Sequence, residues 1–347
     1  MMNSSQSVQS LFKPFTHGNL SLSSRIVMAP MTRQFSPDGV PGLDVADYYR
    51  RRAENSVGLI VTEGTVINHP DASNQGNIPH FHGEAALNGW ANVVTAVHEA
   101  GGRIIPQIWH MGARGAVGDY TESEIAAIVE AFANAALEAK RLGFDGIELH
   151  GAHGYLIDQF FWEKTNPRTD SYGGDMVART RFAVEVIEAC RRAVGPEFPI
   201  VLRFSQWKAS DYTAKLAETP ALLEQFLAPL VAAGVDIFHC SSRRFWEPEF
   251  EGSDLNLAGW TKKLTGKPTI TVGSVGLDSD FMSLFTEGKG ADNTMIDGLI
   301  ERLEREEFDL VAVGRALLVD PAWAQKIRDG RTAEWIPFTS EAVKTLR

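Results

Sequence analysis

The sequence predicts a single (β/α)8 barrel, a TIM barrel of the α/β class, and two observations lead to this expectation. Eight short apolar runs recur along the 347 residues, and amphipathic helical stretches separate most of them. The runs are continuously apolar, as in parallel strands that are covered on both faces. Eight strand–helix units in sequence, with no Pro- or Ser-rich linker between them, favour one barrel over two domains.

The expected strands follow one another along nearly the whole chain. They cover residues 25–30, 57–63, 103–109, 145–150, 199–204, 235–240, 268–273 and 308–314. Helices with apolar residues at helical spacing are expected over residues 84–100, 122–142, 176–193 and 220–233. Thr121, followed three residues later by Glu124, matches a capping box, which predicts that the helix over 122–142 begins there.

An open, doubly wound sheet is the alternative fold. Such sheets often carry a GxGxxG motif after the first strand, whereas here the first strand is followed by MTRQF, which has no glycine. Residues 1–10, MMNSSQSVQS, are polar and lack the apolar core of a signal peptide. We therefore expect a flexible tail over residues 1–10 and one barrel over residues 11–347.

The composition argues against several classes of partner. The formal net charge is -11 and no Lys/Arg run stands out, so neither nucleic acid nor an anionic membrane surface is an expected partner. No apolar run reaches membrane-spanning length. The two cysteines, Cys190 and Cys240, form no CxxC pair, which argues against a disulfide framework or a zinc knuckle. Together these features predict a soluble protein of the cytoplasm.

The stretch GFDGIELHGAHGYLIDQFF, residues 143–161, presents His150, His153 and Tyr155 within six residues. Apolar residues flank this polar cluster on both sides, as in scaffolds that aim side chains into a pocket. The cluster follows the fourth strand, and barrels of this kind hold active sites at the C-terminal strand ends. A metal site that adds Asp158, or a purely structural histidine pair, are the alternatives. Because zinc normally takes a third nearby ligand and no compelling trio stands out, no metal is expected.

Two glycine sites follow the seventh and eighth strands: Gly273 with Ser274, and Gly314 with Arg315. These loops are the usual phosphate position of the barrel fold. Glycine lets backbone N–H groups approach an anion closely, and an arginine adds a forked, charged clamp. A single glycine after a strand is more often a simple turn, but the two sites together predict a ligand that carries phosphate.

These stretches resemble the Old Yellow Enzyme family of flavin-dependent ene-reductases. The matching segments are RIVMAPMTR, VGLIVTEGT, PQIWHMG, residues 143–161 with NPRTDSYGG after them, VLRFS, TVGSVG and DLVAVGRALLVDP. HGAHGYL with RTDSYGG is the most specific part, and the match covers almost the whole chain. The resemblance implies FMN bound noncovalently at the barrel mouth. Some relatives carry Asn where this chain has His153, so it resembles the histidine–histidine type.

The resemblance also implies a role for individual residues. The flavin ring would be lined by Pro30, Met31, Thr32 and Gly64, and its pyrimidine side would be hydrogen-bonded by Gln107 and Arg203. The phosphate would be held by Gly273, Ser274, Gly314 and Arg315. His150 and His153 would bind the substrate oxygen, Tyr155 would donate a proton, and Trp109 would form a pocket wall. Trp246, like Trp207 and Phe245, suits packing as well as pocket lining, and we expect Trp246 to line the pocket.

The implied activity is an FMN-dependent NAD(P)H oxidoreductase that reduces activated C=C bonds. NAD(P)H would reduce the flavin, and flavin N5 would pass hydride to the β-carbon of an alkene conjugated to a carbonyl or nitro group. Two donors would stabilise the charge that develops on the oxygen, at about 3 kcal/mol for one such donor. Tyr155, with an ordinary pKa of about 10, would protonate the α-carbon. The protein is expected to be a monomer or homodimer.

Two other functions remain open on the sequence alone. The same FMN site would suit a reductase of nitro compounds or nitrate esters, because their oxygens also accept hydrogen bonds. A cofactor-free barrel that binds a phosphorylated sugar would use Gly273 and Gly314 equally well, but would have no use for Gln107 and Arg203.

The chain departs from the family pattern after the third strand. Relatives carry a long excursion there that folds as a cap over the pocket, whereas here HMGARGAVGDYTESEI leads almost directly into the next helix. Either the pocket is trimmed and more open, or part of the loop is missing from this chain. Both alternatives bear on substrate preference and leave the expected flavin contacts unchanged.

Overall fold

Eight parallel strands close into a barrel in the computed structural model, which describes residues 8–112, 114–279 and 290–347. Each strand pairs with the next along the chain, and the last pairs back onto the first. The strands are β3 (Ile26–Met28), β4 (Leu59–Val66), β5 (Arg103–Trp109), β6 (Ile147–His153), β7 (Ile200–Lys208), β8 (Ile237–Ser241), β9 (Thr269–Val272) and β10 (Leu310–Val313). The expected TIM barrel is confirmed.

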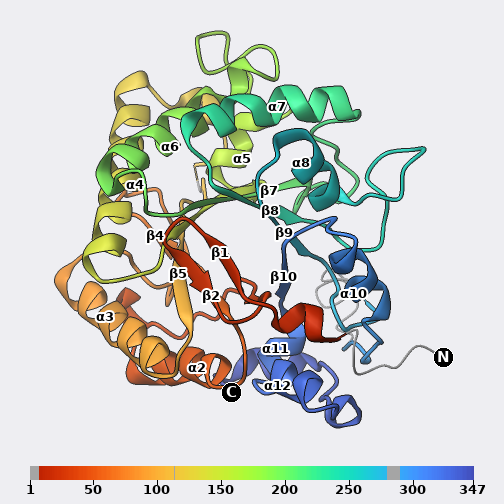
Figure 1. Cartoon of the computed structure of the whole chain (residues 1–347). Coiled ribbons are helices and arrows are strands. Elements are labelled where there is room, and N and C mark those ends of the chain that lie inside the picture. Colours follow the sequence, from red (N-terminus) through yellow and green to blue (C-terminus); the bar gives the residue numbers. More distant parts are fainter. Residues whose placement is uncertain (1–7, 113, 280–289) are drawn as a thin grey trace.

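Helices surround the barrel strands (Figure 1). They are α2 (Leu43–Ala53), α3 (Glu84–Glu99), α4 (Glu122–Arg141), α5 (Leu156–Phe161), α6 (Arg181–Val194), α7 (Pro220–Ala233), α8 (Leu257–Thr265), α10 (Asp297–Glu304), α11 (Arg315–Val319) and α12 (Trp323–Arg328). The capping box before α4 is confirmed, since the Thr121 hydroxyl accepts from Glu124 N and the Glu124 carboxylate accepts from Thr121 N. In the described ranges, none of the helices has both the length and the apolar character that crossing a membrane requires.

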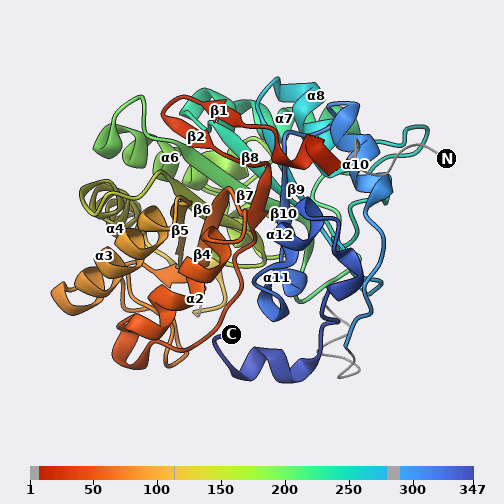
Figure 2. The ribbon, with the colours of Figure 1, turned by 60° about the horizontal axis from the view of Figure 1, so that its bottom comes forward.

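A hairpin that the sequence did not predict precedes the barrel. Its antiparallel strands are β1 (Phe15–His17) and β2 (Leu20–Leu22), and it lies across one end of the barrel (Figures 1 and 2). Phe15, Leu20 and Leu22 are buried in one cluster with inward-facing strand residues such as Val27 and Leu59. Because the chain enters β3 directly after β2, the hairpin seals the end at which the strands begin.

Inside the barrel, apolar residues give way to polar ones toward the C-terminal ends of the strands. Side chains two positions apart on a strand face the same side. Ile105, Val201 and Ile237 belong to the buried interior cluster. Gln107, Arg203 and His239 each follow one of these residues by two positions, so they form the next layer toward the barrel mouth. Their strands therefore deliver three polar side chains to one level.

The expected tail, residues 1–10, lies mostly outside the described residues. Its last three residues begin a short 3-10 helix, Val8–Phe12, in which Ser10 and Leu11 are buried. Cys190 and Cys240 are both free, buried thiols.

Candidate functional site

A buried polar layer lies across the barrel interior and is centred on Glu148 of β6. Gln107 Nε2 donates to Glu148 Oε1 at 2.8 Å, and His239 Nδ1 lies 2.7 Å from Glu148 Oε2. The carboxylate can only accept, so His239 donates through Nδ1 and carries its lone pair on Nε2. Burial lowers the pKa of His239, while Glu148 opposes that shift. The same contact fixes the Gln107 amide, because its Nε2 is directed at Glu148.

Arg203 of β7 brings a cation to this layer. It is 8% exposed, and its Nη2 donates to Ser241 Oγ at 3.4 Å. Burial lowers the pKa of Arg203, and the Glu148 carboxylate opposes that shift. Both Arg203 Nε and His239 Nε2 are buried and have no hydrogen-bond partner among the residues that the structure describes. Since buried polar groups are nearly always paired, an orphaned donor beside an orphaned acceptor fits a ligand with polar edge atoms.

The aromatic side chains at the ends of β5 and β6 form one cluster next to this layer. The ring of His150 packs edge-on against His153 at 5.2 Å and against Tyr155 at 4.9 Å between centroids. Trp109 packs edge-on against Tyr155 at 4.8 Å and nearly parallel to His150 at 6.1 Å. The structure therefore brings together the two imidazoles, the phenol and the indole that the sequence singled out.

Burial makes this cluster neutral. The pKa of His150 and that of His153 lie well below the ordinary value, first because of burial and second because of the nearby Arg203 cation. Burial raises the pKa of Tyr155, with Arg203 opposing. At neutral pH the pocket thus holds two uncharged imidazoles, each with one N–H, and one intact phenol O–H.

His153 is fixed by two neighbours that follow it in the chain. Its Nε2 lies 2.8 Å from Ser241 Oγ, and its ring stacks on Trp207 at 4.4 Å between centroids. Trp207 Nε1 in turn donates to the Ser241 carbonyl at 3.0 Å. Packing and pocket lining explained Trp207 equally well from the sequence, and the structure places it in the cluster.

The strand ends expected to hold the flavin ring lie beside one another. A Cβ atom at Gly314 would lie 3.6 Å from Met31 Sδ, so the segment after β3 meets the segment after β10. Pro30 and Met31 are partly buried in this segment, and Thr32 is exposed. A Cβ atom at Gly64 would lie 2.5 Å from Trp109 Cε3, so the missing side chain makes room for the indole.

The two glycine sites converge at the expected phosphate position. Ser274 Oγ donates to the carbonyls of Arg243 and Ser279, at 3.1 and 3.0 Å, and Arg315 Nη2 donates to the same Ser279 carbonyl. Gly273 has a φ of 142°, and a Cβ atom there would lie 2.8 Å from the Ser242 carbonyl oxygen. Gly273 is buried against the backbone of Ser242 and Arg243, so only glycine fits at this position.

Trp246 lies apart from this group. Its side chain is 40% exposed and packs edge-on against Phe245 at 5.0 Å between centroids. Within the described residues, the Trp246 ring makes no ring contact with His150, His153, Tyr155 or Trp109. Its role in lining the substrate pocket stays a prediction.

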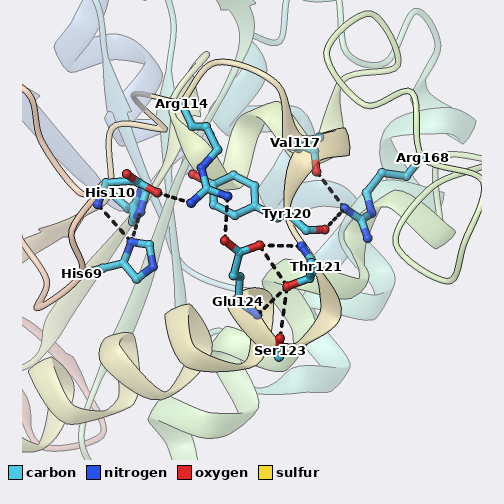
Figure 3. Close-up of polar contacts among 10 residues, drawn as sticks. His69, His110, Arg114, Val117, Tyr120, Thr121, Ser123, Glu124 and Arg168 are labelled. Carbon is cyan, nitrogen blue, oxygen red and sulfur yellow. Dashed lines mark hydrogen bonds and ion pairs between the residues drawn. The ribbon is translucent and has the colours of Figure 1, made fainter.

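The connection from β5 to α4 is short, and side-chain hydrogen bonds and ion pairs hold it to neighbouring segments (Figure 3). Arg114 donates to Asp71 at 2.6 Å and to Glu124 at 2.8 Å, which joins the loop after β4 to the start of α4. Arg168, in the RTDSYGG turn, donates to the carbonyls of Val117 and Tyr120. The sequence assigned this turn no catalysis, and the structure gives Arg168 an anchoring contact. Residue 113 lies outside the described residues.

The His69–His110 pair anchors the same connection (Figure 3). His110 Nε2 lies 3.1 Å from His69 Nδ1, and Gly112 N donates to His110 Nδ1 at 3.0 Å. Burial lowers the pKa of His110 to about 3. No group of three or more His, Cys, Asp or Glu side chains suited to a metal occurs in the part of the chain that the structure describes.

Sequence reasoning missed Glu148, His239 and Ser241. The sequence contains a pattern that could have indicated Glu148 and His239. Glu148 lies two positions before His150, and His239 lies two positions after the apolar Ile237, so each faces the same side of its strand as that neighbour. A polar residue at an inward-facing position of a barrel strand needs a partner. Glu148 and His239 partner each other, and Ser241 partners His153 and Arg203. The pairing across neighbouring strands cannot be read from any one strand.

The polar layer, the two glycine sites and the orphaned Arg203 and His239 atoms fit a flavin mononucleotide. Its pyrimidine edge carries both acceptors and a donor, which match the unpaired groups, and its phosphate matches the Gly273 and Gly314 sites. This match rests on two buried atoms that have no partner in the described part of the chain.

Comparisons with known proteins agree with this fit. The sequence profile of the NADH:flavin oxidoreductase / NADH oxidase family matches residues 10–123 and 117–334. NADH oxidase of Thermoanaerobacter brockii is 34% identical over 356 residues, which are 93% of this chain and 51% of that protein. 12-Oxophytodienoate reductase 7 of Oryza sativa subsp. japonica is 38% identical over 223 residues, 54% of this chain and 56% of that protein. The chain thus spans little more than half the length of these two relatives.

Solved structures share the fold over nearly the whole chain. Morphinone reductase in complex with tetrahydroNAD has a TM-score of 0.79 at 29% identity and covers 96% of this chain and 93% of its own. An Old Yellow Enzyme from Pichia sp. AKU4542 has a TM-score of 0.79 at 23% identity, over 96% of this chain and 90% of its own, and supports the fold alone. The family resemblance drawn from the sequence is confirmed: the chain belongs to the NADH:flavin oxidoreductase / NADH oxidase family.

Proposed function

We propose that this chain is an NAD(P)H-dependent ene-reductase, which reduces C=C bonds conjugated to a carbonyl or nitro group. The observation that carries the proposal is the neutral cluster of His150, His153 and Tyr155 beside Arg203. Two relatives are named as reductases of 12-oxophytodienoate and of morphinone, names that denote oxo compounds. A carbonyl substrate for this chain is in line with those names.

The cofactor would be held by residues from several strand ends. Pro30, Met31, Thr32 and Gly64 would contact the ring, Gln107 and Arg203 its pyrimidine side, and the Gly273–Ser274 and Gly314–Arg315 loops its phosphate. FMN, once bound, supplies the hydride chemistry, with NAD(P)H as the electron donor. Arg203 would favour negative charge near the pyrimidine because its cation is buried there.

His150 and His153 would bind the substrate oxygen. Each neutral imidazole has one N–H, which His153 can offer to the substrate from Nδ1 when its Nε2 accepts from the Ser241 hydroxyl. Negative charge develops on the substrate oxygen as the β-carbon receives hydride. A single donor aimed at such an oxygen is worth about 3 kcal/mol of transition-state stabilisation. His153 is already oriented by Ser241 and Trp207, so little ordering is left for the substrate to bring about.

Tyr155 would deliver a proton to the α-carbon. The raised pKa keeps its phenol protonated at working pH, which a proton donor requires. The edge-on contact with Trp109 restricts where the phenol can point. Trp109 and Trp207 would form two walls of the pocket, on either side of the histidine pair.

The test begins with the purified protein, which should be yellow and should bleach without oxygen when NADH or NADPH is added. Cyclohexenone should then restore the colour, because it takes the hydride. Tyr155→Phe should bleach at a nearly normal rate and reduce cyclohexenone slower by about 10²-fold or more. A colourless protein that takes up no FMN would end the proposal.

A double variant separates substrate binding from cofactor binding. His150→Ala with His153→Ala should lose cyclohexenone binding and keep FMN, as measured by titration of the flavin absorbance. Loss of FMN instead would show that the pair supports the fold.

The alternative function on the same FMN site is reduction of nitro compounds or nitrate esters, which the histidine pair also permits. Faster reduction of a nitrate ester than of cyclohexenone would favour this alternative.

We also propose that the protein works in a reducing compartment such as the cytoplasm, in which the free thiols of Cys190 and Cys240 persist.

A further inference from the structure

A fully buried ion pair lies behind the histidine cluster. Lys208 Nζ, at the end of β7, donates to Asp158 Oδ1 of α5 at 2.5 Å, and both side chains are 0% exposed. In residues 8–112, 114–279 and 290–347, no other lysine ion pair has both side chains fully buried. Neither residue has a part in the proposed reaction.

The pair is joined to the turn that carries two of the proposed functional side chains. Asp158 Oδ2 accepts from Gly154 N at 2.7 Å, and Gly154 stands between His153 and Tyr155. His153 has a φ of 65° and Gly154 a φ of 85°, so two consecutive residues adopt the left-handed conformation. A side chain other than glycine resists this conformation, and the surrounding contacts must hold His153 there.

Lys208 also reaches the other contact that holds this turn. His153 N donates to Ser205 Oγ at 3.0 Å, and Lys208 Nζ lies 3.4 Å from the Ser205 carbonyl oxygen. In the β6–β7 pairing Lys208 stands opposite His153, just past a register shift. Ala209 N donates to the His153 carbonyl at 3.2 Å. The lysine is therefore part of the strand that fixes the backbone of His153.

We propose that Lys208 and Asp158 are positioning residues, which hold the turn from His153 to Tyr155 so that imidazole and phenol face the same substrate. This inference rests on the proposed function. A carboxylate is the strongest acceptor for the Gly154 N–H, and a buried carboxylate needs a counter-charge. Lys208 supplies that charge, and the Asp158 carboxylate in turn accepts the hydrogen bond from Gly154 N.

Stability alone is a weak reason for such a pair. Buried ion pairs can often be replaced by apolar residues of similar volume at no cost in stability, because desolvation offsets the attraction. An apolar replacement, however, has no acceptor for the Gly154 N–H. The acceptor, rather than the charge pair as such, is thus the feature that the turn requires.

Two double variants separate these contributions. Asp158→Leu with Lys208→Met removes the charges and the acceptor, whereas Asp158→Asn with Lys208→Met removes the charges and keeps an acceptor oxygen. We expect the Leu/Met variant to lose about tenfold or more in kcat for cyclohexenone, with FMN content and bleaching by NAD(P)H unchanged. The Asn/Met variant should stay within a few-fold of the unaltered protein.

A second ion pair of the same construction gives a matched control. Lys262 Nζ donates to Asp309 Oδ1 at 3.0 Å, and Asp309 Oδ2 accepts from Thr269 N at 3.0 Å. Asp309 precedes β10 and Thr269 begins β9, so this pair lies at the opposite end of the barrel. Asp309→Leu with Lys262→Met should leave both kcat and KM for cyclohexenone unchanged.

Hydrogen exchange of the Gly154 amide gives a readout that needs no turnover. The Leu/Met variant should exchange this amide faster than the Asn/Met variant, because only the latter keeps its acceptor. Equal turnover in the two double variants, whether high or low, together with equal Gly154 exchange, would overturn the proposal. If the unaltered protein reduces no alkene, the proposed function fails, and Gly154 exchange still decides whether the pair holds the turn.

Discussion

Glu63, the residue before Gly64, shows how one buried carboxylate shapes a neighbouring loop. It is 1% exposed, and its Oε2 accepts from Arg33 N at 2.8 Å and from Gln34 N at 3.1 Å. These amides follow Thr32, so Glu63 holds the segment expected to line the flavin ring. Burial raises the pKa of Glu63 to about 7, although the two backbone donors oppose the shift.

Glu63 should make stability depend on pH in a definite direction. The unfolded chain loses this proton near pH 4.5, whereas the folded protein keeps it until about pH 7. The contribution of Glu63 to stability is therefore fully present below pH 4.5 and falls as pH rises from about 4.5 to about 7, by up to about 1.4 kcal/mol per pH unit. Glu63→Gln should remove this part of the dependence, as measured by urea unfolding at pH 5, 6, 7 and 8.

Glu124 serves as a control of opposite sign. Its pKa is lowered to about 2 by the Thr121 backbone N–H, with Arg114 adding to the shift, so its contribution is lost only as pH falls from about 4.5 toward 2. Glu124→Gln should leave the pH 5–8 behaviour unchanged. The free energies of unfolding of the unaltered protein and of Glu63→Gln are compared at each pH. If their difference stays constant over pH 5–8, Glu63 does not titrate in that range.

At the scale of elements, β4 and β5 are fitted to each other around Gly64. Their pairing shifts register between Val61 and Gly64, and Trp109 of β5 fills the space that a side chain at Gly64 would take. Such a bulge re-aims side chains at the end of a strand. Here it aligns Trp109 with the histidine cluster.

Gly64→Ala should therefore displace the Trp109 ring. The new Cβ atom would lie 2.5 Å from Trp109 Cε3, and overpacking of this kind costs about 1–3 kcal/mol of stability. We expect a lower unfolding midpoint and a rise in KM for cyclohexenone. Gly76→Ala is the matched control, since its Cβ atom would meet nothing within 4 Å. An unchanged KM in Gly64→Ala would count against Trp109 as a pocket wall.

At the scale of the whole molecule, the barrel has an apolar end and a polar end. The β1–β2 hairpin seals the end where the strands begin, and the layer of Gln107, Glu148, Arg203 and His239 lies toward the other. Apolar packing at one end thus stabilises the fold, while the unpaired polar groups lie at the other end. This arrangement is common in barrels, whose functional groups gather at the C-terminal face.

Leu20→Ala should separate these two ends. Leu20 is 1% exposed within the interior cluster, and its truncation should cost about 2–5 kcal/mol of stability. The rate of flavin bleaching by NAD(P)H, measured well below the unfolding temperature, should not change. Ser21→Ala, at an exposed position of the same hairpin, should change neither quantity. A slowed bleaching in Leu20→Ala would show that the seal also shapes the cofactor site.

Much of the fold was predictable because each barrel strand is a local apolar run. All eight expected strands occur, within a few residues of their expected bounds. The hairpin was not predicted, since strands of three residues carry too little pattern to stand out. β6 runs on to His153 because its pairing with β7 continues past the register shift, a contact between distant segments that local sequence does not show.

The barrel, the family and the residues that meet in the aromatic cluster could all be predicted from the amino-acid sequence. Periodicity and motifs are properties of neighbouring residues, and they survive without any knowledge of packing. The folded structure was needed to show that Glu148 joins Gln107 to His239, that Trp207 stacks on His153, and that Lys208 pairs with Asp158. These contacts join separate strands, and a side chain's partner across a barrel depends on register and burial, which the chain acquires only when it folds.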